Sequence, residues 1–274
     1  MGDEILGGII TIKNIINNYK NADINFESLS LEKLKKYADR ENKKAQNALG
    51  DKYYIGDDIA QDYEEAVKWY IKSAEQGYDV AQYNLGDMYY CGNGVEQDYE
   101  KAKEYFEYSA SQGNPDAQCN LACMYEEGLG TGVNYEKAIK WYEKAALQED
   151  FYAQYNLGNL YMYGKGVDID YKRAFKWHMK ASILGYEKSQ NTLGYMYEQG
   201  LGMEKNYEEA VKYYKKAAYQ EYSYAEYNLA TMYYLGNGIT QDRKAAYIWY
   251  QKAANQGLRK AVIALKTKYK EVNI

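Results

Sequence analysis

Cysteine thiols are the side chains in this sequence whose spacing first suggests chemistry. Cys119 and Cys123 lie four residues apart, so a helix would place them on one face, and Cys91 ends an earlier predicted helix. If all three face one groove, their thiolates could bind a metal ion such as Zn²⁺, although no fourth ligand is evident. Small packing or groove-lining side chains are the simpler interpretation. The sequence leaves this question open, and we predict no metal site and no cofactor.

The single histidine, His178, is the other candidate for catalysis. A catalytic histidine needs a nucleophile and an orienting acid nearby, and the sequence identifies neither. The acidic pairs Glu126–Glu127 and Glu208–Glu209 form no catalytic constellation. The Gly-x-Gly pairs follow predicted helices, whereas a phosphate-binding loop joins a strand to a helix. We therefore predict no catalytic residue and expect His178 to be a packed helix residue.

A unit of 36 residues recurs six times in the sequence. The fold of this unit must position the cysteines, the histidine and the acidic pairs. The copies begin at Ala45, Ala81, Ala117, Ala153, Ser189 and Ala225. Every copy has Leu at its fifth position, Tyr at its ninth, Gly at its twelfth and Ala at its twenty-second. A fixed period of this length is typical of stacked structural repeats, so the repeat determines the fold.

Each copy is predicted to form two helices, A and B, joined by a turn. In the second copy Leu85, Met88 and Tyr89 form one apolar face of helix A, and Gly92 follows as the residue that ends it. The eighteenth position is Asp or Asn in every copy, and both are preferred at the start of a helix. In helix B small residues alternate with large aromatic ones, which favours close packing. The four tryptophans share one position there and are expected in the core.

These residues resemble the Sel-1-like repeat family, which is related to tetratricopeptide repeats. The shared pattern is A-Q-Y-N-L-G-x-M-Y-x-x-G-x-G-V followed by D-Y-x-x-A-x-x-W-Y-x-x-A-A-x-x-G, and it covers residues 45–260. The resemblance implies an all-α fold, a right-handed α-solenoid of antiparallel helix pairs without strands. The chain departs from the pattern at Asp58, Glu149 and Glu221, where other copies have glycine, and these departures put the local turn geometry in question.

The resemblance indicates a class of function but no particular partner. It favours a non-enzymatic scaffold or adaptor for protein–protein interaction. The alternative is a hydrolase acting on peptidoglycan-like or β-lactam substrates, as proposed for cysteine-rich members of the family. Those members carry a cysteine pair in each repeat, which this chain lacks. We therefore predict that the chain is not an enzyme.

Segments on both sides of the repeats are predicted to cover the ends of the array. The isoleucine-rich N-terminal segment is too short and too polar for a membrane span, and it lacks the features of a signal peptide. This segment would either cap the array or dock on another molecule. A third hypothesis is that it mediates self-association. The predicted segments are 1–25 for this isoleucine-rich stretch, 26–44 for an N-terminal capping helix, 45–260 for the six repeats and 261–274 for a C-terminal capping helix.

Composition narrows the class of partner. The net charge is −5 and no long basic run is present, so we do not expect a nucleic-acid partner. Three cysteines without a paired pattern argue against a disulfide-stapled secreted protein. Together with the absence of a signal peptide, this predicts a cytoplasmic location.

Helix A of each copy is expected to line a concave groove, by resemblance to tetratricopeptide repeats. Its third, seventh, tenth and eleventh positions should point into the groove, because the fifth, eighth and ninth already supply the core. Tyrosine is frequent at these positions and is enriched at protein-binding surfaces, although the chain is rich in tyrosine everywhere. The predicted partner-binding residues are Tyr54, Tyr83, Asp87, Tyr90, Tyr155, Asn159, Met162, Tyr195, Tyr227 and Tyr234.

The groove residues also predict the chemistry of the partner. Tyr83, Tyr155 and Tyr227 recur 72 residues apart, so they should lie along one side of the groove. Asp51 and Asp87 add negative charge near its N-terminal end. A protein or peptide segment with apolar and basic anchors would fit both features.

Overall fold

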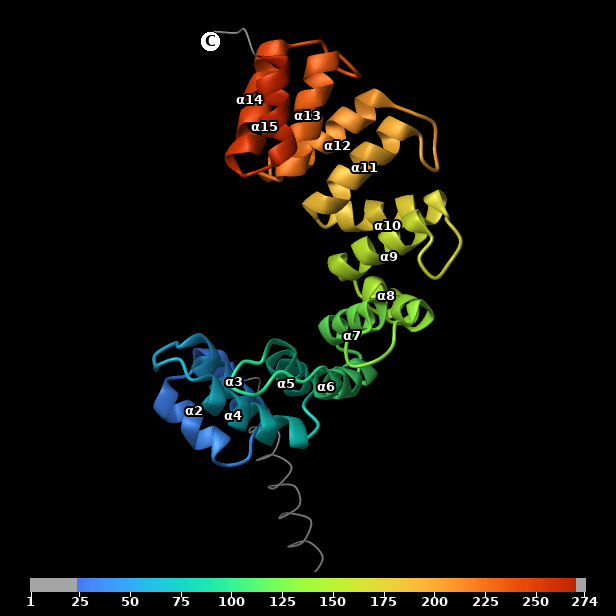
Figure 1. Cartoon of the computed structure of the whole chain (residues 1–274). Coiled ribbons are helices and arrows are strands. Elements are labelled where there is room, and N and C mark those ends of the chain that lie inside the picture. The colour runs from blue at the N-terminus through green and yellow to red at the C-terminus, as the bar shows by residue number, and fades with distance from the viewer. Residues whose placement is uncertain (1–23, 270–274) are drawn as a thin grey trace, which may run out of the picture. The chain divides into compact units, whose positions relative to one another are not determined.

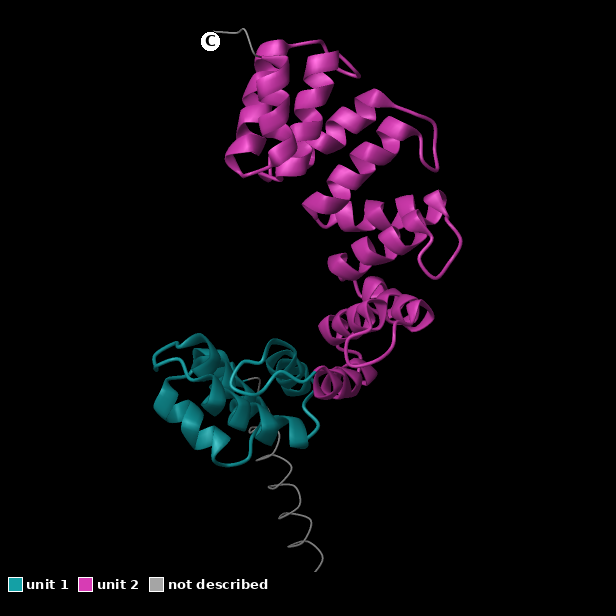
Figure 2. Ribbon diagram, viewed as in Figure 1, with its two compact units in different colours: residues 1–98 teal, residues 99–274 magenta. Residues whose placement is uncertain are grey.

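The structure is a computed structural model that describes residues 24–269 (Figure 1). Within this range the chain is helical and contains no β-strand, as the repeat pattern predicts. It divides into two compact units, residues 1–98 and residues 99–274, which Figure 2 shows in different colours. Most of the isoleucine-rich segment predicted at 1–25 lies outside the described residues.

The helices follow one another in the order that the repeats predict. The first unit contains η1 (Phe26–Ser28), α2 (Leu31–Ala38), α3 (Lys43–Ile55), α4 (Tyr63–Glu75) and α5 (Asp79–Cys91). The second contains α6 (Tyr99–Ser111), α7 (Pro115–Glu127), α8 (Tyr135–Leu147), α9 (Phe151–Tyr163), α10 (Tyr171–Ile183), α11 (Glu187–Gln199), α12 (Tyr207–Ala218), α13 (Ser223–Leu235), α14 (Arg243–Asn255) and α15 (Arg259–Lys268).

Odd-numbered helices from α3 to α13 are the A helices, and even-numbered helices from α4 to α14 are the B helices. Within each unit consecutive helices pack side by side, which gives an all-α solenoid (Figure 1). The A and B helices of the second copy fall in different units. Helix α2 precedes the first copy and α15 follows the sixth, where capping helices were predicted.

Glycine and Asp or Asn determine where the helices end and begin. Each A helix ends at the glycine of the twelfth position, whose φ runs from 67° at Gly164 to 83° at Gly56. At the B helices the side chain of Asn134 accepts a hydrogen bond from the Lys137 backbone N–H, and the equivalent Asp or Asn does the same in α4, α10, α12 and α14. Both predicted signals are confirmed.

The turns keep their geometry where the chain departs from glycine. Asp58, Glu149 and Glu221 adopt positive φ angles of 58°, 65° and 61°. A residue with a Cβ pays for this left-handed conformation with about 1–2 kcal/mol. The sequence departures therefore change the local stability of these turns rather than their path.

The core of each unit combines the leucine of helix A with small and aromatic residues of helix B. Leu229 is buried against Tyr214 and Ala217 in the second unit, and Leu49 is buried with Leu34 and Ala38 in the first. The tryptophans, expected in the core, are only partly buried. A lysine three residues later covers each ring, with Nζ 3.7–4.5 Å from the ring centroid.

Buried glutamines connect each copy to the preceding helix. In the third copy Gln118 donates to the carbonyl oxygen of Ala110 at 3.1 Å and accepts from Gln148 at 2.9 Å. Gln148 also donates to the carbonyl oxygen of Gly113 at 3.0 Å. Gln190 and Gln220 repeat this arrangement in the fifth copy. Because all of these polar groups are satisfied, the row of glutamines can be buried at low cost.

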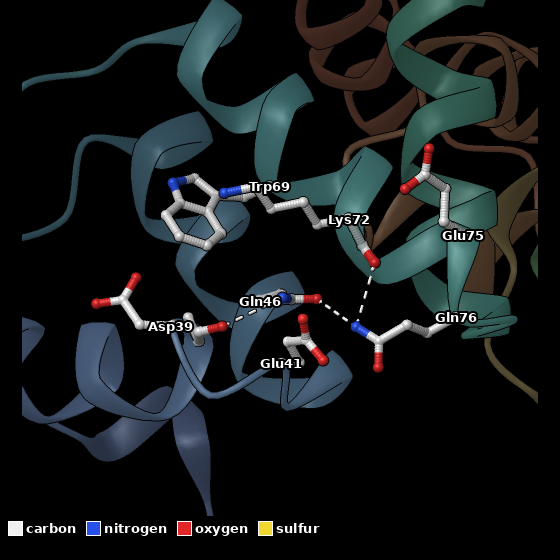
Figure 3. A pocket seen from close by; sticks show the side chains of 8 residues that line it. Asp39, Glu41, Gln46, Trp69, Lys72, Glu75 and Gln76 are labelled. Atoms are coloured by element: carbon white, nitrogen blue, oxygen red, sulfur yellow. Dashed lines mark hydrogen bonds between the residues drawn. The ribbon is translucent and has the colours of Figure 1, made fainter.

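Figure 3 shows the same arrangement in the first unit, where Gln46 donates to the carbonyl oxygen of Ala38 and accepts from Gln76. Here the second amide hydrogen of Gln76 turns back to the carbonyl oxygen of Lys72, and a cavity of about 480 Å³ opens beside the row.

The fourth copy interrupts this row. Leu184 occupies the position of the donor glutamine, so the buried Oε1 atom of Gln154 has no hydrogen-bond partner among the described residues. An unpaired buried acceptor costs about 1–3 kcal/mol. The fourth copy therefore carries a local defect that its neighbours lack.

Candidate partner-binding surface

Hydroxyl groups from the B helices reach polar residues of the A helices. The aromatic residue at the twenty-sixth position of each copy lies on helix B, and its ring packs against a glycine of helix A in the first, fourth and fifth copies. The hydroxyl of Tyr70 donates to Asp51 at 2.8 Å, that of Tyr214 donates to Glu198 at 2.6 Å, and that of Tyr250 is 2.9 Å from the Thr231 hydroxyl. These bonds fix side chains at the seventh and tenth positions. We call the third, seventh, tenth and eleventh positions together the A-helix face.

The A-helix face of the first unit carries two partly buried carboxylates. Asp51 accepts from Tyr70 and, at 3.2 Å, from Asn84 on one oxygen, and from Asn47 at 2.9 Å on the other. Burial raises the pKa of Asp51 to about 6, despite the Tyr70 hydrogen bond, and burial also raises the pKa of Asp87. Neither carboxylate pairs with a lysine or arginine among the described residues of this unit. A bound cation would therefore find one acceptor, Asp51, that hydrogen bonds already hold in place.

The predicted residues of the first unit are partly exposed on this face. Tyr54 packs its ring on Tyr63 at 5.3 Å between centroids, and its pKa is raised by burial and by the nearby Asp87. Tyr83, Asp87 and Tyr90 are all partly exposed. The structure thus brings Tyr54 and Asp87 together.

Tyr155, in the second unit, is packed more tightly than expected. Its ring meets His178 at 5.6 Å and Tyr186 at 5.2 Å between centroids, both edge to face. Phe151 and Tyr152 continue this aromatic cluster around Tyr186. Tyr155 therefore contributes to folding as well as to the surface.

The other predicted residues of the second unit differ in their exposure. Tyr195 is 43% exposed, whereas Met162 is only 4% exposed and offers a partner almost no surface. Tyr227 is partly buried between Tyr250 and the Lys260 ammonium, which lies 4.3 Å from its ring centroid. The remaining two, Asn159 and Tyr234, are partly exposed.

Tyr163, at the eleventh position of the fourth copy, occupies a predicted groove position but was left out of the predicted partner-binding residues. It is exposed, and its pKa is raised by burial and by the neighbouring hydroxyls of Tyr155 and Tyr195. Tyr155, Tyr163 and Tyr195 form the aromatic part of the A-helix face in this unit.

His178 is a packed helix residue, as predicted. Its Nδ1 atom lies 3.4 Å from the hydroxyl of Ser189, and its Nε2 atom has no partner in the described part of the chain. Burial lowers the pKa of His178 to about 3, so the ring is neutral in the folded state. No acid orients the ring among these contacts, so the His178–Ser189 contact lacks the third group that orients the base in a catalytic nucleophile–base pair.

A second exposed surface was also missed. Leu147, Ile183 and Tyr219 are 72%, 77% and 70% exposed, and each lies at the C-terminal end of a B helix in three consecutive copies. The first, second and sixth copies have Glu75, Ser111 and Asn255 at this position. We call Leu147, Ile183 and Tyr219 the helix-B ridge.

Residues 24–269 contain neither a cluster of metal ligands nor a membrane-spanning helix. No three His, Cys, Asp or Glu side chains there are placed to hold a metal ion together. No helix within this range is long and apolar enough to cross a membrane. Cys119 and Cys123 do share a face of α7, whereas Cys91 belongs to the other unit.

Comparison with known proteins identifies the family to which the repeats belong. The family model of the Sel1 repeat matches residues 43–78, 79–114, 115–150, 151–186, 188–222 and 223–258. The chain belongs to the Sel1 repeat family. Proteins of this family generally serve as protein-interaction scaffolds and are typically non-enzymatic. No curated protein sequence matches the chain.

Two solved structures of Sel1-like repeat proteins resemble the chain. A protective antigen of uropathogenic Escherichia coli is 38% identical, with a TM-score of 0.84 over 88% of this chain. This chain spans 53% of the length of that protein. A Sel1 repeat protein from Oxalobacter formigenes is 32% identical, with a TM-score of 0.74 over 79% of this chain and 89% of its own. Both confirm the solenoid fold, and neither supports the hydrolase alternative.

Proposed function

We propose that this Sel1 repeat protein is a non-catalytic scaffold that binds a protein or peptide segment on the A-helix faces of its repeats. The observation that carries the proposal is the pair of partly buried carboxylates, Asp51 and Asp87, beside partly exposed tyrosines. Burying a carboxylate without a cation is unfavourable. A ligand that supplies the cation would recover this free energy.

The chemistry of the face defines the partner segment. A lysine or arginine would approach Asp87, and apolar side chains would lie against Tyr54 and Tyr90. Tyrosine presents a rigid apolar ring with a polar end, so such contacts need little ordering of the protein surface. In the second unit Tyr163 and Tyr195 offer further aromatic surface for an apolar anchor.

A peptide library selected on the intact protein tests this proposal. We expect the selected sequences to combine basic and apolar residues, and their Kd is then measured by fluorescence anisotropy. Asp87→Asn keeps the shape of the side chain and removes its charge, so it should raise Kd by at least about ten-fold, or about 1.4 kcal/mol. Glu64→Gln on helix α4 is the matched control, because it removes an exposed carboxylate from a B helix.

The effects of these substitutions on Kd show which surface binds the peptide. Equal effects of Asp87→Asn and Glu64→Gln would mean that the peptide responds only to net charge. Loss of binding on substitution of Ile183 in the helix-B ridge, with Asp87→Asn unchanged, would assign the interaction to the ridge and contradict the proposal.

A further inference from the structure

Leu184 occupies a position of the repeat that is glutamine in the other five copies. Those glutamines, at the thirty-second position, are Gln76, Gln112, Gln148, Gln220 and Gln256. Leucine here leaves the buried Oε1 atom of Gln154 without a partner among the described residues, which lowers stability. Leu184 itself is exposed, so it gains little from burial in return. Departures from the rules of folding are typical of functional surfaces.

Two aromatic residues beside Leu184 also depart from the repeat. Phe151 and Tyr152 begin helix α9, and no other copy has two adjacent aromatic residues at this point. Their ring centroids lie 4.3 Å apart, and they lie 5.1 and 5.4 Å from the ring of Tyr186. A cavity of about 220 Å³, which we call the aromatic socket, is lined by Phe151, Tyr152, Leu184, Gly185, Tyr186 and Glu187.

The aromatic socket is open to solvent and large enough for one side chain. Its walls Tyr152 and Leu184 are 53% and 44% exposed, whereas Tyr186 is buried. A protein cavity of about 150 Å³ holds a benzene ring, so the larger socket has room for an aromatic side chain. The three rings offer the edge-to-face and offset contacts that aromatic pairs prefer. The socket therefore has the size and the chemistry to accept an aromatic anchor.

Basic side chains extend from the socket along helix α10. Lys172, Lys176 and Lys180 are exposed, and with Ile183 they recur at spacings of four and three residues, so they share one face of the helix. Helix α10 contains no Asp or Glu, although the whole chain has a net charge of −5. This face thus joins a row of cations to an exposed apolar residue beside the socket.

We propose that the aromatic socket and the basic face of α10 form a docking surface for an acidic protein segment with one aromatic anchor. The anchor enters the socket, and the Asp or Glu side chains of the segment pair with Lys172 and Lys176. Anchors that fill pockets supply much of the binding free energy at protein interfaces, whereas exposed charges mainly steer association. A lipid bilayer has no side chain to fill the socket, so the socket favours a polypeptide over a membrane.

This docking surface does not depend on the proposed function of the A-helix face. The A-helix face is proposed to bind basic segments through Asp87, whereas the basic face of α10 attracts acidic ones. The two surfaces therefore predict peptides of opposite charge. Asp87→Asn should leave the Kd of an acidic peptide within about two-fold of its parent value. Either proposal can fail while the other stands.

A displayed library of random short peptides, selected on the full-length protein, tests the docking surface. Counter-selection on the double variant with Leu184→Gln and Lys176→Glu discards every peptide that binds elsewhere, including on the A-helix face. Circular dichroism confirms that the double variant is folded. The sequences that remain should contain an aromatic residue and an excess of Asp and Glu.

Single variants then separate the socket from the charges through the Kd of a retained peptide. Leu184→Gln should raise Kd at least about ten-fold because it replaces an apolar wall of the socket with an amide, whereas Leu235→Gln, which removes another exposed leucine of this unit, should not. Lys176→Glu should raise Kd at least about five-fold at low salt and less at high salt. Lys68→Glu, at the same repeat position in α4, is its matched control.

Three results would overturn the proposal. The first is a selection that retains no peptide, or only peptides that are basic or lack an aromatic residue. The second is an equal effect of Leu184→Gln and Leu235→Gln, or of Lys176→Glu and Lys68→Glu. The third comes from sedimentation with vesicles of phosphatidylcholine and phosphatidylserine: binding that Leu184→Gln and Lys176→Glu abolish, with no peptide retained, would assign this surface to a membrane.

Discussion

Leu184→Gln should stabilise the protein by restoring a missing hydrogen bond. In the third and fifth copies the equivalent glutamine donates to a buried glutamine at 2.9 and 2.8 Å, whereas Gln154 Oε1 has no partner among the described residues. Pairing a buried acceptor recovers about 1–3 kcal/mol. Leu184 is 44% exposed, so its loss of apolar contact costs about 1 kcal/mol. The expected net gain in the free energy of unfolding is about 1 kcal/mol.

Urea denaturation followed by circular dichroism measures this gain. A shift of about 1 kcal/mol corresponds to roughly 2–4 °C in melting temperature for a domain of this size. Gln148→Leu is the matched reverse variant, because it removes a donor that Gln118 Oε1 and Gly113 O now share. It should destabilise by about 1–3 kcal/mol. A Leu184→Gln protein no more stable than its parent, with Gln148→Leu costing nothing, would refute the role assigned to the glutamine row.

Three further predictions test the turns, the histidine and the groove. Glu149→Gly should raise the free energy of unfolding by about 1 kcal/mol in urea denaturation, because glycine adopts a φ of 65° without strain. The unfolded chain protonates His178 below about pH 6.5 and the folded chain only near pH 3, so stability should fall on acidification by up to about 1.4 kcal/mol per pH unit. His178→Phe, measured over the same pH range, should show a shallower fall, and an equal slope would count against a buried neutral ring. Leu157→Ala should destabilise by about 2–5 kcal/mol, whereas Tyr195→Ala should leave the thermal melt nearly unchanged. Equal losses in these two variants would place Tyr195 in the core.

The helix boundaries could be predicted because they depend on local chemistry. Gly92 ends α5 in a left-handed conformation, and Asn134 caps α8 through its own side chain. Both signals act within a few residues of the chain. The register of the helix pairs then follows from the repeated leucine and alanine positions.

The exposure of the groove tyrosines could be predicted only in part. Tyr155 and Tyr195 both belong to the positions predicted to face the groove, yet one is packed and the other is open. The difference arises from Tyr186, which lies at the far end of the same copy and meets the Tyr155 ring. A helical pattern identifies the face of a side chain but not the residue that a distant turn places against it.

Interactions between copies were likewise hidden from the repeat pattern. The bond between Gln118 and Gln148 joins residues 30 positions apart, so the consequence of Leu184 appears only when the helices are packed. The Cys119–Cys123 spacing did predict a shared face, whereas Tyr142 and Asn156, whose side chains contact the Cys123 sulfur, come from two later helices. The cytoplasmic location stays a prediction.

Hydroxyl-radical footprinting with a selected peptide tests the central claim most directly. The method reports the solvent access of individual tyrosine side chains in the intact protein with and without the peptide. Binding on the A-helix face predicts protection of Tyr163 and Tyr195, while the exposed rings of Tyr108 and Tyr219 on the B helices stay fully reactive. Protection of Tyr219 with unchanged Tyr163 and Tyr195 would contradict the account and place the partner on the helix-B ridge.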